Sequence, residues 1–153
     1  MAIYLVQHGK SLPKNLDPQQ GISKEGRADV DRIAAVARNY GIQVAKIVHS
    51  GKLRALQTAE IFAEAFDISD KMTARKGLNP LDDVVLFAET VNSEDEMMAV
   101  GHLPFMEKLT AYLVAGDDEK TVFKFQNGGI VCLDKGSDSR TWYIKWALMP
   151  KIC

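Results

Sequence analysis

Short apolar segments alternate with longer segments of helical periodicity along this chain, and that alternation constrains its fold more than any other feature. The short segments predict buried strands at 2–6, 44–48 and 96–100. The longer segments repeat apolar residues at helical spacing and predict helices at 24–40, 53–66, 81–91 and 104–115. This order favours a mostly parallel sheet covered on both faces, so we predict an α/β fold, a three-layer αβα sandwich.

The C-terminal part of the chain follows a different pattern. Segments 129–133 and 141–148 are typical of strands, and the turn-rich segment 134–140 between them favours a hairpin that gives the sheet an antiparallel edge. Segment 72–78 is ambiguous. A length of 153 residues suits one domain, so we expect residues 1–153 to form a single domain.

Composition and charge argue against several classes of protein. The formal net charge is −1 and Lys and Arg form no long run, so we expect no nucleic-acid partner. The sequence contains neither a secretory signal nor a run of about 20 apolar residues, which predicts a cytoplasmic protein without a membrane partner. Cys132 and Cys153 form no CxxC pair, and no histidine or carboxylate cluster has ligand spacing. We therefore expect no disulfide framework, metal or other cofactor.

Polar clusters stand at the ends of three predicted strands. They are Gln7-His8-Gly9, then His49-Ser50 leading to Arg54 in the next helix, and Gly101-His102. Because ligands bind beyond the carboxyl ends of parallel strands, we expect the three clusters to share one crevice.

The residue types in these clusters suit a phosphoryl group. A neutral imidazole at His8 can attack phosphorus and carry the phosphoryl group covalently, while Gly9 lets the backbone approach closely. Arg54 offers a planar fork to phosphate oxygens at a helix N-terminus, and His102 can hydrogen-bond another oxygen. Each residue alone fits a structural or solvated role, so the prediction of a phosphoryl-binding site depends on their combination. We interpret His49 as structural or surface.

The letters around these residues resemble a known family. The sequence reads Y-L-V-Q-H-G-K-S near its start, then S-G-K-L-R-A-L-Q-T-A, then V-G-H-L-P-F. This resembles the histidine phosphatase superfamily, also called phosphoglycerate mutase-like, and the short chain with its closing W-A-L-M-P is similar to the SixA-type phosphohistidine phosphatases. The resemblance implies a phosphoglycerate mutase-like fold, His8 as nucleophile, Arg54 as phosphate clamp and His102 as the second histidine of the pocket. Further substrate contacts are expected from four neighbours: Gln7, Gly9, Lys10 and Ser50.

Two positions depart from the family pattern. Gln7 stands where the family has Arg, and losing that cation removes charge-assisted hydrogen bonds worth roughly 1.5–3 kcal/mol each. Gly51 stands where the family usually has Pro, which predicts a looser turn. We hypothesise that Lys10 and Lys52 restore the missing positive charge; two solvated lysines are the alternative.

We predict a metal-independent phosphatase that works through a covalent intermediate at His8. Its expected substrate is phosphohistidine on a partner protein, or else a small phosphate ester. The alternative is a degenerate phosphate- or phosphoprotein-binding module with little turnover, because Gln7 replaces the family Arg. A general acid would come from Asp82, Asp83 or Glu89, although the two aspartates suit the first turn of a helix equally well. The oligomeric state stays open.

Overall fold

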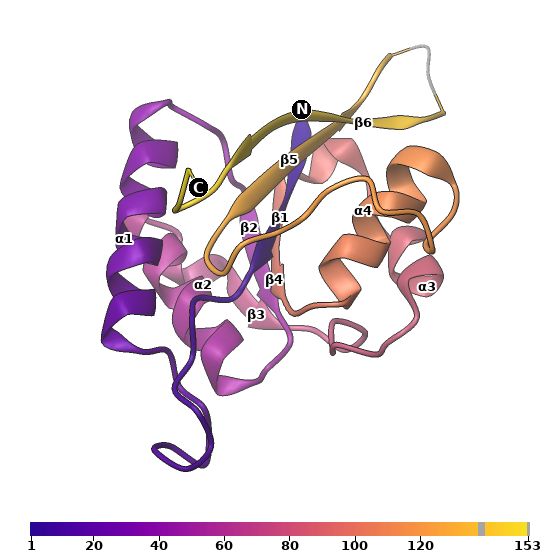
Figure 1. The fold of residues 1–153 in the computed structure, drawn as a ribbon. Helices are drawn as coiled ribbons and strands as arrows, with labels where there is room; N and C mark the ends of the chain where they lie inside the picture. The colour runs from indigo at the N-terminus through magenta and orange to yellow at the C-terminus, as the bar shows by residue number, and fades with distance from the viewer. Residues whose placement is uncertain (138–139, 153) are drawn as a thin grey trace.

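A six-stranded mixed sheet forms the centre of the computed structural model, which describes residues 1–137 and 140–152 (Figure 1). The strand order is β3-β2-β4-β1-β5-β6. The strands are β1 (Ala2–Gln7), β2 (Lys46–His49), β3 (Met72–Ala74), β4 (Met97–Gly101), β5 (Ile130–Lys135) and β6 (Trp142–Leu148). Strands β1 to β4 are parallel, whereas β5 is antiparallel to β1 and β6 to β5, so the predicted hairpin and antiparallel edge are confirmed.

Helices cover both faces of this sheet. Figure 1 shows α1 and α2 on one side of the strands and α3 and α4 on the other. The helices are α1 (Lys24–Asn39), α2 (Leu53–Ala65), α3 (Val84–Ala88) and α4 (Phe105–Ala115), with short 3₁₀ turns at Ser69–Lys71 and Ser93–Asp95. The predicted three-layer αβα sandwich is therefore confirmed. Among the described helices, none is long and apolar enough to cross a membrane.

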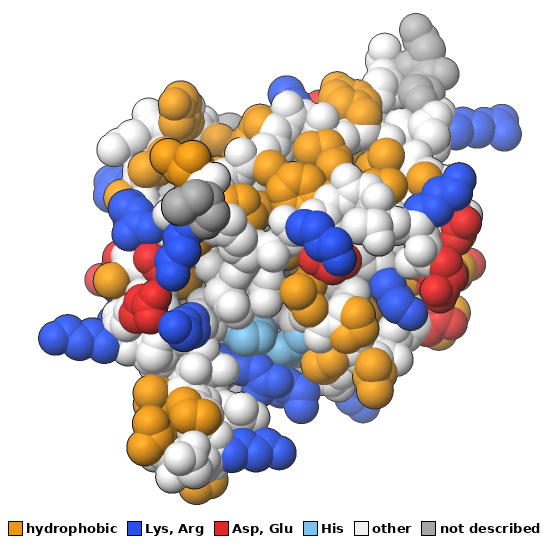
Figure 2. Space-filling model, viewed as in Figure 1, with side chains coloured by type: hydrophobic (Ala, Val, Ile, Leu, Met, Phe, Trp, Pro, Cys, Tyr) orange, Lys and Arg blue, Asp and Glu red, His pale blue; other side chains and the backbone are white. Residues whose placement is uncertain are grey.

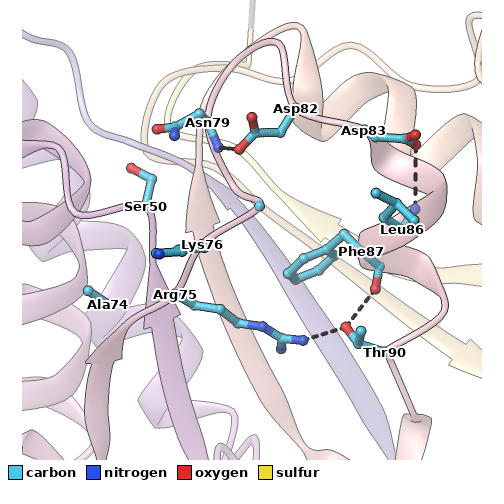
Figure 3. A pocket seen from close by; sticks show the side chains of 11 residues that line it. Ser50, Ala74, Arg75, Lys76, Asn79, Asp82, Asp83, Leu86, Phe87 and Thr90 are labelled. Carbon is cyan, nitrogen blue, oxygen red and sulfur yellow. Dashed lines mark hydrogen bonds between the residues drawn. The ribbon is translucent and has the colours of Figure 1, made fainter.

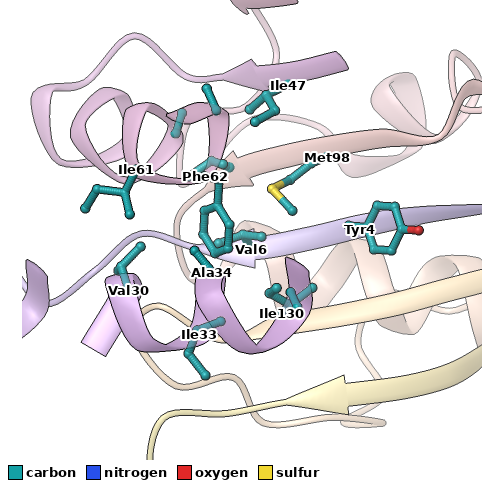
Figure 4. Packing of buried hydrophobic residues seen from close by; sticks show 14 of the residues in the cluster. Tyr4, Val6, Val30, Ile33, Ala34, Ile47, Ile61, Phe62, Met98 and Ile130 are labelled. Carbon is teal, nitrogen blue, oxygen red and sulfur yellow. The ribbon is translucent and has the colours of Figure 1, made fainter. Parts of the chain in front are cut away.

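The buried strand β1 divides its side chains between two cores. Tyr4 and Val6 lie in the core under α1 and α2, where Phe62 fills the space between helix and sheet (Figure 4). Leu5 points to the opposite face and belongs to the core that contains Phe105 of α4. Successive strand residues point to opposite faces, so an uninterrupted apolar strand is what a sheet covered on both sides requires.

The structure differs from the sequence prediction in two short elements. The helix predicted at 81–91 is only α3. It begins late because the carboxylate of Asp83 accepts hydrogen bonds from the N–H groups of Val85 and Leu86 and caps it, and it ends at Ala88 with Glu89 as the C-cap. The ambiguous segment 72–78 contains β3, a three-residue edge strand paired with β2.

Close packing at the start of α1 fixes the loop that follows β1. Ser23 is the N-cap of α1, and its Oγ accepts the N–H of Gly26. A Cβ at Gly26 would overlap the backbone of Lys10, so only glycine allows the helix to approach this loop so closely.

Candidate active site

The carboxyl ends of three neighbouring strands bring the predicted clusters together. Gln7 at the end of β1 pairs with Gly101 of β4, and His49 at the end of β2 pairs with Val100. The residues that follow these strands therefore lie at one edge of the sheet. In Figure 2, histidine side chains are visible in a hollow that Lys and Arg side chains border.

His8 and His102 face each other at this edge. Their ring centroids are 5.0 Å apart and the ring planes are inclined by 51°. Nδ1 of His8 lies 2.7 Å from the carbonyl oxygen of Gly9. A carbonyl oxygen only accepts, so Nδ1 carries the proton and Nε2 presents its lone pair. This tautomer makes Nε2 the nucleophilic atom of the ring.

Burial keeps both imidazoles neutral. It lowers the pKa of His8 to about 4, helped by the charge of Arg54 and opposed by the Gly9 carbonyl. It lowers the pKa of His102 to about 3, with smaller contributions from His8, Arg54 and Lys52. Near neutral pH, His8 is therefore in the unprotonated form that a nucleophile needs.

His102 is held by Ser50. Its ring is 1% exposed, and Nε2 lies 2.6 Å from the Ser50 hydroxyl oxygen. Nδ1 is buried without a hydrogen-bond partner among the described residues. A bound anion would raise the pKa of this ring, since a nearby negative charge favours the imidazolium.

Arg54 lies in the first turn of α2, where the prediction placed it. Its charge lowers the pKa of both His8 and His102. Burial lowers the pKa of Arg54 itself, but an arginine guanidinium stays protonated in proteins.

Buried Thr58 connects the nucleophile loop to this helix. Its hydroxyl accepts the N–H of Gly9 at 2.8 Å and donates to the carbonyl of Arg54 at 2.7 Å. On the other side, the Asn127 side-chain amide donates to the His8 carbonyl at 3.1 Å. Our sequence prediction assigned neither residue to the site. The Q-T-A letters around Thr58 and the N-G-G turn at Asn127 were the available signals.

Gln7 and the two lysines expected to compensate for its missing charge have different surroundings. Gln7 is 7% exposed, and its Oε1 has no hydrogen-bond partner within the described part of the chain. Lys10 forms an ion pair with Glu25 at 2.9 Å, so it has a partner other than a phosphoryl group. Lys52 is exposed but its charge lowers the pKa of His102. A contact of either lysine with phosphate stays a prediction.

A hydrogen bond and a positive φ define the turn between β2 and α2. The looser turn expected from Gly51 in place of the family Pro stays a prediction. The Gly51 N–H donates to Nδ1 of His49 at 3.1 Å. The φ angle of Gly51 is 89°, which proline cannot adopt. His49 is 5% exposed, which agrees with a structural role and not a surface one.

A pocket of about 770 Å³ is lined by Ser50, whose hydroxyl contacts His102, but not by His8, His102 or Arg54 themselves (Figure 3). Lys76, Asp82 and Asp83 also line it, whereas Glu89 lies outside it. The Asp82 carboxylate accepts the backbone N–H of Asn79, and Asp83 caps α3. Both aspartates thus have local structural partners, but they precede α3, so the alternative that placed them in the first turn of a helix is wrong. Among the described residues, no group of three or more His, Cys, Asp or Glu lies close enough to hold a metal ion.

Comparison with known proteins identifies the family. A sequence profile of the histidine phosphatase superfamily (branch 1) matches residues 3–82, which contain His8 and Arg54. The chain belongs to this superfamily. No curated protein sequence matches it.

Solved structures share the whole fold of this superfamily member. The protein histidine phosphatase SixA complexed with tungstate has a TM-score of 0.81 and 21% identity, covering 98% of this chain and 97% of that one. A proposed phosphohistidine phosphatase SixA from Agrobacterium tumefaciens has a TM-score of 0.76 and 24% identity, covering 97% of each chain. Phosphoserine phosphatase from Entamoeba histolytica, in complex with 3-phosphoglyceric acid, has a TM-score of 0.72 and 14% identity, covering 95% of each chain. The phosphoglycerate mutase-like fold is therefore confirmed.

Proposed function

We propose that this protein is a phosphatase that forms a phosphohistidine at Nε2 of His8. One observation carries the proposal: two neutral imidazoles face each other at 5.0 Å, and the Gly9 carbonyl fixes the His8 tautomer that leaves Nε2 free. Membership of the histidine phosphatase superfamily supports a phosphatase activity.

The reaction divides into two displacements. Nε2 of His8 attacks phosphorus, the new P–N bond forms, and the bond to the leaving group breaks with its electron pair going to that group. The imidazole of a phosphohistidine leaves with the ring proton it already carries, whereas an alkoxide takes a proton from an acid or from water. Water then attacks the phosphohistidine, the P–N bond to His8 breaks, and inorganic phosphate leaves. Each step is an in-line displacement for which the site must fix geometry and charge.

Arg54 and His102 stabilise the charge on the phosphoryl oxygens. The guanidinium offers bidentate hydrogen bonds, and its charge is close enough to lower the pKa of both histidines. His102, neutral without an anion, gains a proton as negative charge approaches and becomes a donor to an equatorial oxygen. Ser50, 2.6 Å from Nε2, holds that ring in place.

The preferred substrate is phosphohistidine on a partner protein, with a small phosphate ester second. The pocket beside Ser50 accepts the leaving group, and its two aspartates are engaged with Asn79 and the N-terminus of α3. A protonated imidazole leaves more easily than an alkoxide, so a phosphoramidate needs less help from an acid. This favours phosphohistidine over an alcohol-derived ester.

A binding module with little turnover is the second candidate. The uncharged Gln7 precedes the nucleophile, and its Oε1 has no partner among the described residues. Such a pocket holds one cation fewer than the family pattern, which weakens stabilisation of the transition state more than it weakens simple retention of an anion.

Turnover by wild type and His8→Ala separates the two candidates. Each protein is incubated with a phosphohistidine protein and with an aryl phosphate, and phosphate release is measured. The phosphatase proposal expects release by wild type, fastest with phosphohistidine, and loss of release in His8→Ala. Equal background rates in both proteins, with retained phosphate binding, would favour the binding module.

A further inference from the structure

The buried side chain of His49 lies outside the reaction described above, yet it makes a specific contact beside it. Nδ1 accepts the N–H of Gly51 at 3.1 Å, two residues along the chain. Burial lowers the pKa of His49, and Glu60 of α2 opposes this shift, so the ring is neutral near pH 7. The Gly51 donor requires the lone pair on Nδ1, which places the ring proton on Nε2.

A second contact follows in the residues that lead into α2. Lys52 is the N-cap residue of α2, but its side chain makes no capping hydrogen bond with the described residues. Instead, the Ser50 hydroxyl oxygen accepts the N–H of Lys52 at 3.4 Å, and His49 accepts the N–H of Gly51. Two side chains that precede the helix therefore accept the N–H groups of Gly51 and Lys52, the two residues that lead into its first turn.

The same turn carries two groups of the phosphate site. Ser50 lies 2.6 Å from Nε2 of His102, and Arg54 occupies the first turn of α2 immediately after the turn. A shift of this turn therefore moves the hydroxyl that holds His102 and the guanidinium together. The backbone of His49 is itself fixed, because its carbonyl accepts the Arg75 N–H at 2.8 Å.

We propose that His49 is a positioning residue, whose Nδ1 holds the turn at Gly51 so that Ser50 and Arg54 meet one phosphoryl group. This inference rests on the proposed phosphate site. It also accounts for glycine at position 51, since the arrangement needs both a backbone N–H and a positive φ, and proline supplies neither.

The chain itself shows which replacement preserves the contact. Asp17, Asp83, Asn92 and Asp117 each accept, through Oδ1, the backbone N–H two residues later. His49 makes the same connection with a ring nitrogen. Asparagine at position 49 keeps a neutral acceptor for the Gly51 N–H, whereas leucine keeps an apolar volume without an acceptor.

The test compares wild type, His49→Asn and His49→Leu. Affinity for tungstate is measured by calorimetry, turnover of an aryl phosphate gives kcat and KM, and circular dichroism gives the folded fraction. We expect tungstate affinity and kcat/KM of His49→Leu to fall by about 10- to 100-fold per folded molecule, the scale of a misplacement near 1 Å. His49→Asn should stay within about threefold of wild type, because its carbonyl replaces Nδ1.

Two outcomes would overturn the inference. One is a folded His49→Leu with the tungstate affinity and kcat/KM of wild type. The other is an equal loss in both variants at equal folded fraction, which would mean that the volume of the ring matters and its acceptor does not. If wild type binds tungstate but turns over neither a phosphohistidine protein nor an aryl phosphate, the proposed function fails, while the affinity series still decides the role of His49.

Discussion

At the residue scale, Gln7 is one of the two positions that depart from the family pattern. It supplies an amide where the family has a guanidinium, and its Oε1 is buried without a partner among the described residues. A charge-assisted hydrogen bond contributes roughly 1.5–3 kcal/mol in a desolvated site. The cost of this substitution falls on the step that develops most negative charge.

Gln7→Arg should therefore raise kcat/KM for an aryl phosphate by about 10- to 100-fold, since each 1.36 kcal/mol corresponds to a factor of ten. Gln7→Met, which is similar in length but uncharged and without an amide, is the matched control and should lower it. Steady-state kinetics at saturating and limiting substrate give the comparison. Unchanged or lower activity of Gln7→Arg would show that this pocket already works through the amide.

His102 also makes the folded protein sensitive to acid. Burial lowers its pKa from an ordinary 6.5 to about 3, so the unfolded chain takes up a proton between these values that the folded protein does not. The free energy of unfolding therefore falls as the pH drops through this window. His8, with a pKa near 4, adds to the same trend.

In the variant His102→Asn, position 102 no longer takes up a proton when the chain unfolds. Urea unfolding between pH 7 and pH 4 should show a shallower loss of stability than wild type, by up to about 1.4 kcal/mol per pH unit. The slope is compared and not the absolute stability, because the substitution also changes packing. Identical slopes in the two proteins would show that His102 is not a neutral buried base.

At the element scale, the long and strongly patterned segments were predictable and the short ones were not. Strand β1 and helix α1 follow from an apolar run and from a capped amphipathic repeat. Helix α3 begins later than predicted because the Asp83 side chain accepts the first backbone N–H groups. Such a cap does not change the spacing of apolar residues from which the helix was predicted. Strand β3 has three residues at a sheet edge and offers little pattern to detect.

The candidate site shows the same division. His8, Arg54 and His102 were predictable because they follow strands or open a helix, and their neighbours match a family pattern. The contact between His49 and Gly51 was not, because it depends on a positive φ that the sequence does not specify. The link through Thr58 also depends on a long-range approach of two elements.

Thr58 provides a prediction about how α2 is coupled to the nucleophile loop. In Thr58→Val the Gly9 N–H loses its buried acceptor, which should cost about 1–3 kcal/mol of unfolding free energy and lower kcat/KM. Thr110→Val is the matched control, because Thr110 is equally buried and donates at 2.7 Å to the Met106 carbonyl in α4. Denaturant unfolding and steady-state kinetics of both variants give the result. Equal effects on activity would contradict the coupling.

At the scale of the whole molecule, the sheet order assembles the site. Strand β4 lies between β1 and β2, so segments that follow three strands far apart in the sequence meet at one edge. Alternation of strands and helices predicts this edge, but the register that sets the two imidazoles face to face comes only from the structure. The pocket beside Ser50 is lined by a residue that follows β2, and we propose that it takes the leaving group.

The carboxylates of this pocket allow a test of the substrate class. Asp82→Asn and Asp83→Asn should leave turnover of phosphohistidine within about threefold of wild type, because its leaving group needs little acid catalysis. Turnover of an alkyl phosphate should fall by about tenfold or more in the variant that removes an acid. Glu89→Gln is the control outside the pocket. A comparable loss with phosphohistidine would contradict the preference for a phosphoramidate.

The central claim is that Nε2 of His8 carries the phosphoryl group, and rapid-quench trapping with a radiolabelled substrate tests it most directly. The account predicts a protein-bound label that is acid-labile and base-stable, maps to His8 and is missing in His8→Ala. Label on another residue, or full turnover by wild type with no trapped phosphoenzyme and no dependence on His8, would contradict it.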